Sequence, residues 1–484
     1  MSKQPFFSIV IPTRNRPQLL KFALISLLKQ SFTDFEVIVS DNSFPKDVRE
    51  VFEKYSDDRF KYVRPEHELP MCSNWEFALS HAQGKYVTIL EDKMFYYQEG
   101  LNNYYKVIQK ESYPDIINTN EDSYILTNEE QGQIEGYLQR KISGNGYKVY
   151  DPQQVIEEKI ECKWGDLVVH AEDAVENIHC GGGIGSLMGG MIKNEVIDAV
   201  RKKYGKVFDS YCPDYGPMIL FLNEAKSAVG LLDNQVVHIH SNTSNGKRTE
   251  MDVKLLYDFI FNSEVGVQRM EYAVVPNMLF GCENLVTADY NYALEKIGFP
   301  KRCNTLNFIY VIESNIAMIK KWPSKDWKKK HLNLLEQAKN KALNTSETNQ
   351  KPEKKYFIEP KITETYSVAS PEMCMDAVDL GSSEEKLLFD AMEKYDKVYC
   401  YGAGTWGRYI AKLFAQQGKA INGFIVSSKT QDRVEGTQVY SLQEYDNIGN
   451  ACIIIAVSPR YQKDIIANLQ AKGIDNFYLP KWLF

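Results

Sequence analysis

Apolar and polar stretches alternate over the first 43 residues in an order that predicts a strand, a helix and a second strand. Residues 7–11 form an apolar run that ends at Pro12, and apolar residues then recur at helical spacing between residues 19 and 28. A second apolar run, residues 35–39, leads into Asp41 and Asn42. The pattern predicts the start of a parallel βαβ unit, and ligands of open α/β sheets bind outside the carboxyl ends of such strands.

The alternation of strand and helix signals continues to about residue 132. The further elements that we predict there are a short strand at residues 61–63, a helix at residues 74–82 and a buried strand at residues 86–90. The last strand leads directly into Glu91, Asp92 and Lys93. Charged side chains are therefore expected at the carboxyl end of this strand too, in the same sheet.

Changes in pattern and composition divide the chain into four parts. Residues 251–343 carry apolar residues at helical spacing, and the stretch after them is rich in Lys, Glu, Thr, Asn and Pro, as linkers are. A second set of strand and helix signals surrounds a glycine-rich turn near the C-terminus. The predicted parts are an N-terminal α/β domain at 1–250, a helical appendage at 251–343, a linker at 344–384 and a second, small α/β domain at 385–484.

Composition narrows the class of protein. The formal net charge of −7 argues against general nucleic-acid binding, which uses basic domains. Nine cysteines are scattered without a CxxC pair, which favours reduced thiols in a cytoplasmic protein. No run approaches the ~18 apolar residues of a membrane span. Residues 320–330 mix lysines with two tryptophans, so we expect either peripheral contact with an anionic membrane surface or a solvated helix face.

The polar residues at the predicted strand ends are of the types that a nucleotide-sugar transferase needs. Such an enzyme must hold a base, a ribose and a diphosphate, and must stabilise negative charge on the leaving diphosphate. Asp41 can accept hydrogen bonds from a base or ribose, Arg14 and Arg16 can place positive charge near phosphate, and Asp92 can reach a metal or ribose. The alternative is that these residues are ordinary turn formers and solvated strand ends.

Over residues 5–245 the chain resembles the family 2 glycosyltransferases of GT-A fold. The resemblance rests on three segments, residues 7–16, 35–43 and 74–92. It implies inverting transfer of a sugar from a nucleotide diphosphate sugar, with a UDP-sugar preferred. It places Pro12, Thr13 and Asp41 around the base, Asn74 near the nucleotide and Asp92 in the acidic metal-binding motif. Together, the nucleotide-binding candidates are Pro12, Thr13, Arg14, Arg16, Asp41, Asn42, Asn74, Glu91 and Asp92.

Lys93 departs from that family pattern, which usually has a further carboxylate at its acidic motif. Three alternatives follow. Asp92 holds Mg²⁺ or Mn²⁺ together with a later histidine such as His240, or the Lys93 ammonium itself neutralises the diphosphate without a metal, or the site is inactive. We favour weak or absent metal dependence, with Lys93 as a catalytic residue.

Asp214 is the candidate catalytic base. In the resembling family an acidic residue in a matching place, before a helix, deprotonates the acceptor hydroxyl, and Asp214 precedes an apolar helix predicted from residue 218. The alternative is a helix N-cap.

Farther along, His238 and His240 share one face of a predicted strand at residues 236–240. His240 is a candidate metal ligand, and the alternative is a structural histidine.

Gly402, Gly404 and Gly407 form a GxGxxG pattern between a predicted strand and helix in the second α/β domain. The following strand ends without an acidic residue to hold a ribose, so neither NAD nor redox chemistry is expected. The region resembles small Rossmann-like domains of bacterial sugar-modifying proteins. That resemblance leaves open a ligand-binding loop, for a nucleotide or sugar nucleotide, and a structural or pairing module.

The sequence therefore predicts a bacterial-type glycosyltransferase of surface polysaccharide or glycolipid assembly. Its acceptor would be a saccharide or a lipid-linked hydroxyl, and homo-oligomer formation stays open. One alternative is a non-catalytic protein that binds sugar nucleotides or glycans and carries a decayed metal motif. A third hypothesis, an oxidoreductase centred on Gly402 and its neighbours, predicts a nicotinamide signal that we do not expect.

Overall fold

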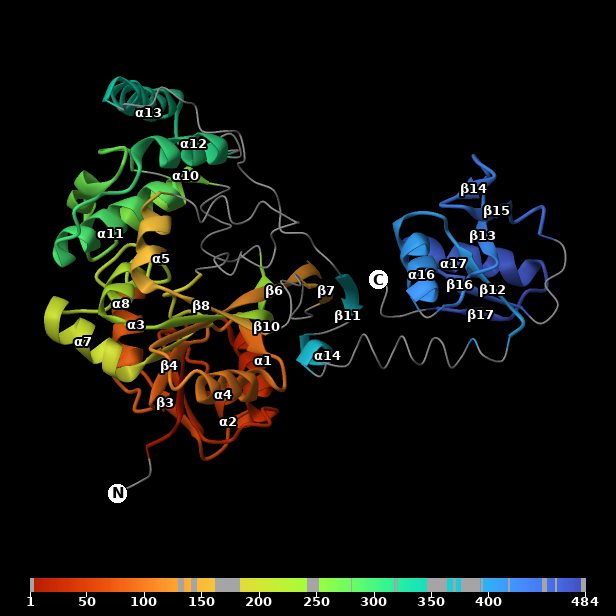
Figure 1. The fold of residues 1–484 in the computed structure, drawn as a ribbon, viewed down its shortest axis with the longest axis horizontal. Coiled ribbons are helices and arrows are strands. Elements are labelled where there is room, and N and C mark those ends of the chain that lie inside the picture. The colour runs from red at the N-terminus through yellow and green to blue at the C-terminus, as the bar shows by residue number, and fades with distance from the viewer. Residues whose placement is uncertain are drawn as a thin grey trace. The chain divides into compact units, whose positions relative to one another are not determined.

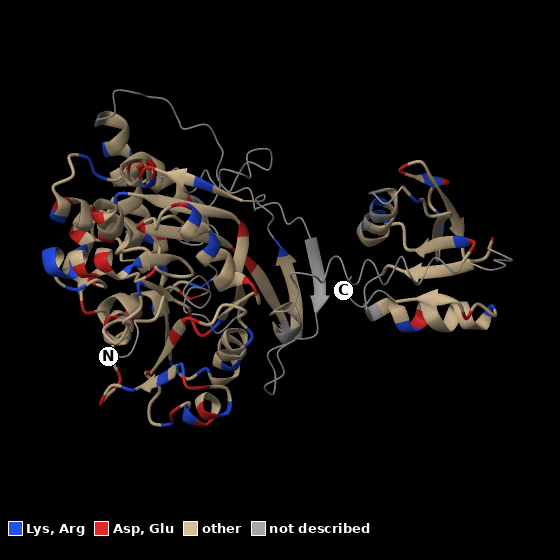
Figure 2. Cartoon of the chain, turned by 60° about the horizontal axis from the view of Figure 1, so that its bottom comes forward, with Lys and Arg blue, Asp and Glu red and all other residues tan. Residues whose placement is uncertain are grey.

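A computed structural model of the chain contains two compact units (Figure 1). One comprises Met1–Gly132 and Gln139–Thr363, and the other comprises Gln133–Leu138 and Glu364–Phe484. Acidic and basic residues are interspersed along both units (Figure 2). The structure describes residues 4–128, 135–140, 146–161, 183–241, 252–279, 281–316, 319, 321–345, 364–368, 371–375, 392, 395–416, 418–445, 451–457 and 459–479.

Four parallel strands form the part of the first sheet that the apolar runs predict. They are β1 (Phe7–Thr13), β2 (Phe35–Asp41), β3 (Phe60–Val63) and β4 (Tyr86–Ile89), in the order β4-β1-β2-β3. Every residue of β1, β2 and β4 is buried, and strands covered on both faces are expected to be apolar throughout. Helix α1 (Pro17–Leu28) connects β1 to β2 and begins with proline, which suits a first helical turn. The predicted parallel βαβ opening is confirmed.

Further strands extend this sheet with mixed directions, and β11, whose bounds are given below, lies next to β7 at its end. They are β5 (Met94–Tyr96), β6 (Ile116–Asn128), β7 (Glu135–Arg140), β8 (Tyr147–Tyr150), β9 (Met191–Lys193) and β10 (Ala228–His240). Strand β9 is antiparallel to both β4 and β6, and β10 is parallel to β6 and antiparallel to β5 and β8. The strand predicted at residues 236–240 is the end of β10, which pairs His238 with Met94 of β5. This pairing brings the end of β10 beside the residues that follow β4.

The helices of this part of the chain are α2 (Arg49–Lys54), α3 (Met71–Leu79), α4 (Gly100–Lys110), α5 (Pro152–Ile160), α7 (Asn194–Tyr204) and α8 (Met218–Glu224). Helix α3 begins three residues before the helix predicted at 74–82, directly after Pro70. Proline can precede a helix because its extended backbone suits the position before the first turn. The chain leaves α3 at Leu79, so the residues predicted for its last turn lie outside it.

The region predicted to be a helical appendage shares its core with the sheet. It contains α10 (Val253–Phe261), the 3₁₀ helix η4 (Val267–Tyr272), α11 (Cys282–Ile297), α12 (Thr305–Ile316) and α13 (Lys325–Thr345). One continuous hydrophobic core runs from Val10 of β1 to Leu335 of α13. Helix α11 is buried over most of its length, from Asn284 to Leu294. Among the described helices, none is long and apolar enough to cross a bilayer.

The second unit contains a six-stranded sheet in the order β14-β15-β13-β12-β16-β17. Its neighbours are parallel from β15 to β17, and only β14 is antiparallel to its partner. Short elements lie within the predicted linker, since β11 and α14 fall between residues 344 and 384. The bounds are β11 (Glu364–Val368), α14 (Pro371–Met375), β12 (Lys397–Tyr401), α16 (Thr405–Gln416), β13 (Gly423–Val426), β14 (Arg433–Val434), β15 (Thr437–Ser441), β16 (Ala451–Ile455), α17 (Pro459–Ala471) and β17 (Phe477–Tyr478).

Candidate functional site

The carboxyl ends of β1, β2 and β4 lie side by side and carry the polar residues singled out in the sequence. Thr13 and Asp41 face each other in register at the ends of β1 and β2. Val10 of β1 pairs with Ile89 of β4, so the residues that follow β4 start beside the end of β1. The strand pairing thus gathers Thr13, Asp41 and the segment Glu91 to Lys93 at one edge of the sheet.

Asp92 is buried and both of its carboxylate oxygens accept hydrogen bonds. Thr13 Oγ1 donates to Oδ2 over 2.8 Å, and Arg16 Nη1 donates to Oδ1 over 2.9 Å. Burial raises the pKa of Asp92 above its usual value, against the opposing charge of Arg16. Asp92 in turn raises the pKa of Arg16. The acidic motif is therefore joined to a fixed cation within the chain.

Glu91 and Lys93 form a second ion pair next to the first, with 3.0 Å between Glu91 Oε2 and Lys93 Nζ. Burial acts to raise the pKa of Glu91, but the positive charge of Lys93, with smaller effects of His238 and Arg16, outweighs it and lowers that pKa. Burial also opposes the charge of Lys93, while Glu91 raises the pKa of Lys93 overall. Both groups are therefore charged at neutral pH.

Asp41 and Asn42 have hydrogen-bonding partners inside the fold. Asp41 is fully buried and accepts from the backbone N–H groups of Ser43 and Val48 over 2.9 Å and from the Tyr62 hydroxyl over 2.6 Å. Asn42 forms two 2.8 Å hydrogen bonds with the backbone of Leu69. Both side chains order the loops after β2, and their predicted contact with a nucleotide stays a prediction.

The other predicted nucleotide ligands lie in different surroundings. Asn74 is buried in α3 and accepts a 2.8 Å hydrogen bond from the Ser40 hydroxyl at the end of β2. Arg14 does not join the Asp92 pair, because it is exposed and forms an ion pair with Glu68. Pro12 is a buried residue of β1, paired with Ser40. Of the two arginines, Arg16 is thus the one that the fold brings to the acidic motif.

Asp214 lies on the segment between α7 and α8 and is not a helix N-cap. Helix α8 begins after Pro217, which is its N-cap residue, so the N-cap interpretation of Asp214 is wrong. Burial and the negative charge of Glu91 raise the pKa of Asp214 to about 7, with Lys93 and His238 acting in the opposite direction. Asp214 therefore lies within electrostatic reach of the Glu91–Lys93 pair. A carboxylate with a pKa near neutrality can take up and release a proton at working pH.

His238 and His240 lie on one face of β10, as alternation along a strand requires. Their rings stack with 4.7 Å between centroids. His238 Nδ1 is 3.2 Å from Glu121 Oε1, and His240 Nε2 is 3.0 Å from Ser123 Oγ. Glu121 and Ser123 are contacts that the sequence analysis missed. Both residues lie in an unbroken polar run of β6, residues 118–123, and such a run does not indicate which of its side chains share a face with the histidines.

The carboxylates of the acidic motif are paired with cations of the chain itself. Both oxygens of Asp92 are used by Thr13 and Arg16, and the ammonium of Lys93 is next to Glu91. His240 is exposed and contacts Ser123. Within the described parts of the chain, no three His, Cys, Asp or Glu residues are grouped as metal ligands. In this arrangement Arg16 and Lys93 supply the positive charge next to the two carboxylates.

Backbone packing accounts for two of the three glycines at the candidate loop of the second unit. Gly402 has a φ of +104°, and a Cβ at Gly407 would lie 1.8 Å from the Gly402 carbonyl oxygen. A Cβ at Gly404 would meet no atom within 4 Å. The Tyr401 and Ser427 hydroxyls, at the ends of β12 and β13, are 2.9 Å apart. The ligand-binding role of this loop stays a prediction.

Comparison with known proteins identifies the family of the N-terminal region. Residues 8–152 match the family described as "Glycosyl transferase family 2". A "GalNAc(5)-diNAcBac-PP-undecaprenol beta-1,3-glucosyltransferase" of Campylobacter jejuni is 36% identical over 91 residues, which are 18% of this chain and 29% of that protein. A "UDP-Glc:alpha-D-GlcNAc-diphosphoundecaprenol beta-1,3-glucosyltransferase WfgD" of Escherichia coli is 26% identical over 84 residues, 17% of this chain and 33% of that protein. This chain thus spans about a third of the length of these curated relatives.

Among solved structures, residues 1–349 of TarS from S. aureus, in complex with UDP-GlcNAc, are similar with a TM-score of 0.38 and 13% identity. That similarity covers 70% of this chain and 91% of the TarS chain, and it says nothing about substrate. The residues that match the family model include the parallel strands whose ends carry the acidic motif. The chain therefore carries a glycosyltransferase family 2 domain within its α/β fold.

Proposed function

We propose that the protein is an inverting glycosyltransferase that moves a sugar from a nucleotide diphosphate sugar to an acceptor hydroxyl. The observation that carries this proposal is that the segment of Asp214 and the end of β4, which leads into Glu91 and Lys93, both contact residues 186–187. Ser186 Oγ donates to the Asp214 carbonyl over 3.5 Å, and the Leu187 carbonyl accepts from the Ile89 N–H over 2.8 Å. The ion pairs of Lys93 with Glu91 and of Arg16 with Asp92 follow directly on β4. A group able to accept a proton at neutral pH and two fixed cations are what such a transfer requires.

In the proposed reaction Asp214 takes the proton of the acceptor hydroxyl. The oxygen of that hydroxyl attacks the anomeric carbon, and the bond between this carbon and the diphosphate breaks with its electron pair going to the diphosphate. Lys93 and Arg16 stabilise the negative charge that develops there. Thr13, Asp41 and Asn74, at or beside the ends of β1 and β2, are proposed to hold the nucleotide.

The proposed mechanism uses no metal. In it the side chains of Lys93 and Arg16 supply the positive charge at the diphosphate. A lysine ammonium acts as a point charge toward phosphate and an arginine can bind two phosphate oxygens at once, so both suit this role. The Glu91 and Asp92 carboxylates keep the two cations in place.

The donor and acceptor are proposed by analogy with the relatives. The printed name of the E. coli relative includes a UDP-sugar donor, and both curated relatives are named for undecaprenol-linked acceptors. We therefore favour a UDP-sugar and a saccharide or lipid-linked acceptor of surface polysaccharide assembly. No nucleic acid is proposed as a partner, and homo-oligomer formation stays a prediction.

Calorimetric titration of the full chain with UDP, GDP, CDP and TDP, each with Mn²⁺ and with EDTA, tests the proposed function. We expect UDP to bind with the same affinity under both conditions, and the matching UDP-sugar to release UDP slowly through hydrolysis. Binding that requires Mn²⁺ would overturn the metal-free mechanism. Tight UDP binding without any turnover of donor, with or without saccharide acceptors, would favour a non-catalytic sugar-nucleotide-binding protein.

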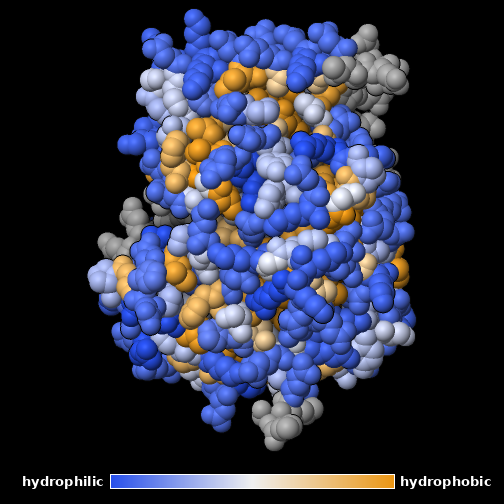
Figure 3. Space-filling view, turned by 90° about the vertical axis from the view of Figure 1, so that its left-hand side faces the viewer, coloured by the Kyte–Doolittle hydropathy of each residue, from blue (hydrophilic) through white to orange (hydrophobic). Residues whose placement is uncertain are grey.

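Peripheral membrane contact is proposed for a basic–aromatic face formed by Tyr257, Phe261, Trp322, Trp327, Lys321, Lys325, Lys328 and Lys329. Ring contacts link Tyr257 to Phe261 and to Trp327, and Trp327 to Trp322, with centroids 4.4 to 5.9 Å apart. Phe261 is 50% exposed and the four lysines are exposed. Figure 3 shows apolar side chains below a hydrophilic rim at the α13 end of the molecule. One exposed ring and three half-buried rings next to exposed lysines suit the interface of an anionic bilayer.

Co-sedimentation with lipid vesicles tests this face. The full chain should bind vesicles containing phosphatidylglycerol and not those of phosphatidylcholine alone, with less binding at high salt. Replacing Lys325, Lys328 and Lys329 together by Glu should reduce the bound fraction about tenfold or more, since each lysine contributes about 1 kcal/mol. The control with the same change in charge replaces the exposed Lys46, Lys202 and Lys463 by Glu. Equal losses in both triple variants would contradict the proposed face.

A further inference from the structure

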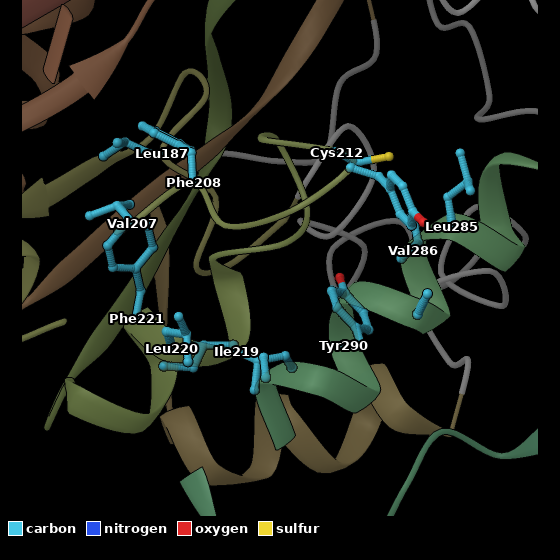
Figure 4. Packing of buried hydrophobic residues seen from close by; sticks show 14 of the residues in the cluster. Leu187, Val207, Phe208, Cys212, Ile219, Leu220, Phe221, Leu285, Val286 and Tyr290 are labelled. Atoms are coloured by element: carbon cyan, nitrogen blue, oxygen red, sulfur yellow. The ribbon is translucent and has the colours of Figure 1, made fainter. Parts of the chain in front are cut away.

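The segment that carries Asp214 runs from the end of α7 to the start of α8 without helix or strand. Buried backbone N–H groups need hydrogen-bond partners, and a segment outside regular structure must find them elsewhere. In this segment the partners are side-chain carboxylates from two distant helices. Figure 4 shows buried surroundings of the segment, with Val207 and Phe208 near Phe221 of α8, and Cys212 on the side of Leu285 and Val286 of α11.

Asp289 of α11 holds the half of the segment that is nearer to Asp214. The backbone N–H of Tyr211 donates to both of its carboxylate oxygens, over 3.0 and 2.9 Å, and the N–H of Cys212 donates to Oδ2 over 3.1 Å. Asp289 is only 2% exposed. Burial raises the pKa of Asp289 to about 7, while Arg269 and the two backbone N–H groups favour its ionised form. A buried acidic side chain is thus used to fix two consecutive backbone groups.

Arg269 of η4 ties Asp289 to the same segment. Its Nη1 donates to the backbone carbonyl of Asp209 over 2.9 Å and approaches Asp289 Oδ1 at 3.4 Å, and its Nη2 donates to Asp209 Oδ1 over 3.0 Å. The guanidinium lies over the ring of Tyr292, 3.5 Å from the centroid. Lys296 of α11 adds a 2.9 Å hydrogen bond to Asp209 Oδ2.

Glu76 of α3 holds the opposite half of the segment. Its Oε2 accepts from the backbone N–H groups of Val207 and Phe208, over 2.9 and 3.1 Å. The turn at Asp214 is then built on Cys212, because the carbonyl of Cys212 accepts from the N–H of Tyr215 over 3.1 Å and of Gly216 over 2.7 Å. Any shift of Cys212 therefore shifts the turn that presents Asp214.

We propose that Asp289 is a positioning residue for the catalytic base: through the backbone of Tyr211 and Cys212 it sets where the Asp214 carboxylate lies relative to Glu91 and Lys93. The inference rests on the proposed function, in which Asp214 is the base. It gives the helical region a role in the reaction, since α11 and η4 supply the groups that order the segment. The positioning is indirect, because these contacts reach the backbone and not the Asp214 side chain.

Asp289→Asn in the full chain tests the proposal. Asparagine keeps one acceptor oxygen but turns an N–H₂ group toward donors, so it cannot accept from Tyr211, Cys212 and Arg269 together. We expect kcat to fall about 10²-fold, with KM for the donor and calorimetric UDP affinity unchanged, because a displacement of about 1 Å has that effect on rate. The midpoint of the acid limb of the kcat/KM profile should move by about half a pH unit or more, as the surroundings of Asp214 change.

A matched control is Asp252→Asn, which removes the N-cap carboxylate of α10 in the same helical region. Asp252 also accepts from a backbone N–H, that of Lys254 over 3.0 Å. Because asparagine caps a helix about as well as aspartate, the control should lose little thermal stability, and it should keep kcat and the acid limb. A loss of activity in Asp289→Asn with an unmoved acid limb, or no loss at all, would overturn the proposal. If Asp289→Asn does not fold, Arg269→Lys is used for the same test. We then expect a smaller loss of kcat and a shift of the acid limb of the kcat/KM profile.

Hydrogen exchange separates this proposal from the proposed function. The amides of Tyr211 and Cys212 should exchange about tenfold faster or more in Asp289→Asn than in wild type, and those of Val207 and Phe208, held by Glu76, should change less. If the wild-type chain turns over no donor, the proposed function fails, and exchange still shows whether Asp289 orders the segment. Unchanged exchange at Tyr211 and Cys212 overturns the positioning role whatever the activity.

Discussion

Asp214→Asn should lower kcat/KM for sugar transfer by about 10²- to 10⁴-fold, the range that a general base contributes, while UDP binds as tightly as to wild type. Asparagine has nearly the same size but cannot accept the proton of the acceptor hydroxyl. The measurements are initial rates of UDP release with acceptor present and calorimetric UDP affinity. Rates close to those of wild type would assign the base to another titratable group of the site.

The pH profile of the wild-type enzyme provides a second test of the same residue. Because the base works in its ionised form and the pKa of Asp214 is raised to about 7, kcat/KM should rise with pH through about 7 and then level off. Glu91→Gln should move this limb to lower pH, since it removes a negative charge that raises the pKa of Asp214. In Asp214→Asn the remaining rate should lack this limb.

Thermal unfolding tests whether Asp214→Asn is folded. The variant should be less active than wild type but more stable at pH 8. The folded-state pKa of Asp214 lies above its value in the unfolded chain, so the protonated form is favoured by folding, and this advantage is lost as pH rises toward 7 and beyond. The ionised Asp214 therefore costs stability at pH 8. Asp214→Asn should unfold at a higher temperature than wild type at pH 8, and the difference should shrink toward pH 4. An inactive variant with a lower unfolding temperature at pH 8 would instead indicate damage to the fold.

Lys93→Met is expected to produce the other large effect, a loss of kcat of about 10²- to 10³-fold. This is the usual cost of removing one preorganised group that stabilises developing negative charge. The variant should also show an acid limb at higher pH, because Lys93 lowers the pKa of Asp214. The proposed metal-free mechanism also predicts the same wild-type rate with EDTA and with Mn²⁺.

Lys193→Met provides a matched control for that substitution. Lys193 forms a 2.9 Å ion pair with Asp115, and the side chains are 17% and 15% exposed, close to the 15% and 19% of Lys93 and Glu91. It lies on β9, away from the carboxyl ends of β1 and β2. The control should retain full kcat.

Lys93→Asp should become inactive with EDTA and regain part of its rate with Mn²⁺. A wild-type enzyme that loses activity with EDTA would contradict the role assigned to Lys93.

Two arginines in one motif illustrate what the sequence could not distinguish. Arg14 and Arg16 are equally basic and only two residues apart, and both were predicted to face phosphate. Asn15 between them adopts a positive φ of 56°, and its N–H donates to Ser43 Oγ over 2.7 Å. This turn sends Arg16 to Asp92 and leaves Arg14 exposed with Glu68. Local composition does not encode such a choice, because it depends on a loop from another strand.

The hydrogen bonds of Glu76 and Asp289 to the backbone of the Asp214 segment could not be predicted for a similar reason. Glu76 and Asp289 are separated from their backbone partners by about 130 and 78 residues. The one sequence signal is a helix whose polar residues, Asp289 among them, fall on faces that are otherwise apolar, so that each needs a buried partner. That signal indicates that each polar residue has a hydrogen-bond partner, but it does not identify the partner.

The sequence by itself determined the parallel strands, the polar residues at their carboxyl ends and the family of the N-terminal domain, because apolar runs and short motifs are local properties. Tertiary structure alone decided which charges meet: Arg16 with Asp92, Lys93 with Glu91, and Asp214 within reach of both Glu91 and Lys93. It also joined the helical region to the sheet in one core. The physical reason is that ion pairs and buried hydrogen bonds depend on distance in space, and packing of the whole chain sets that distance.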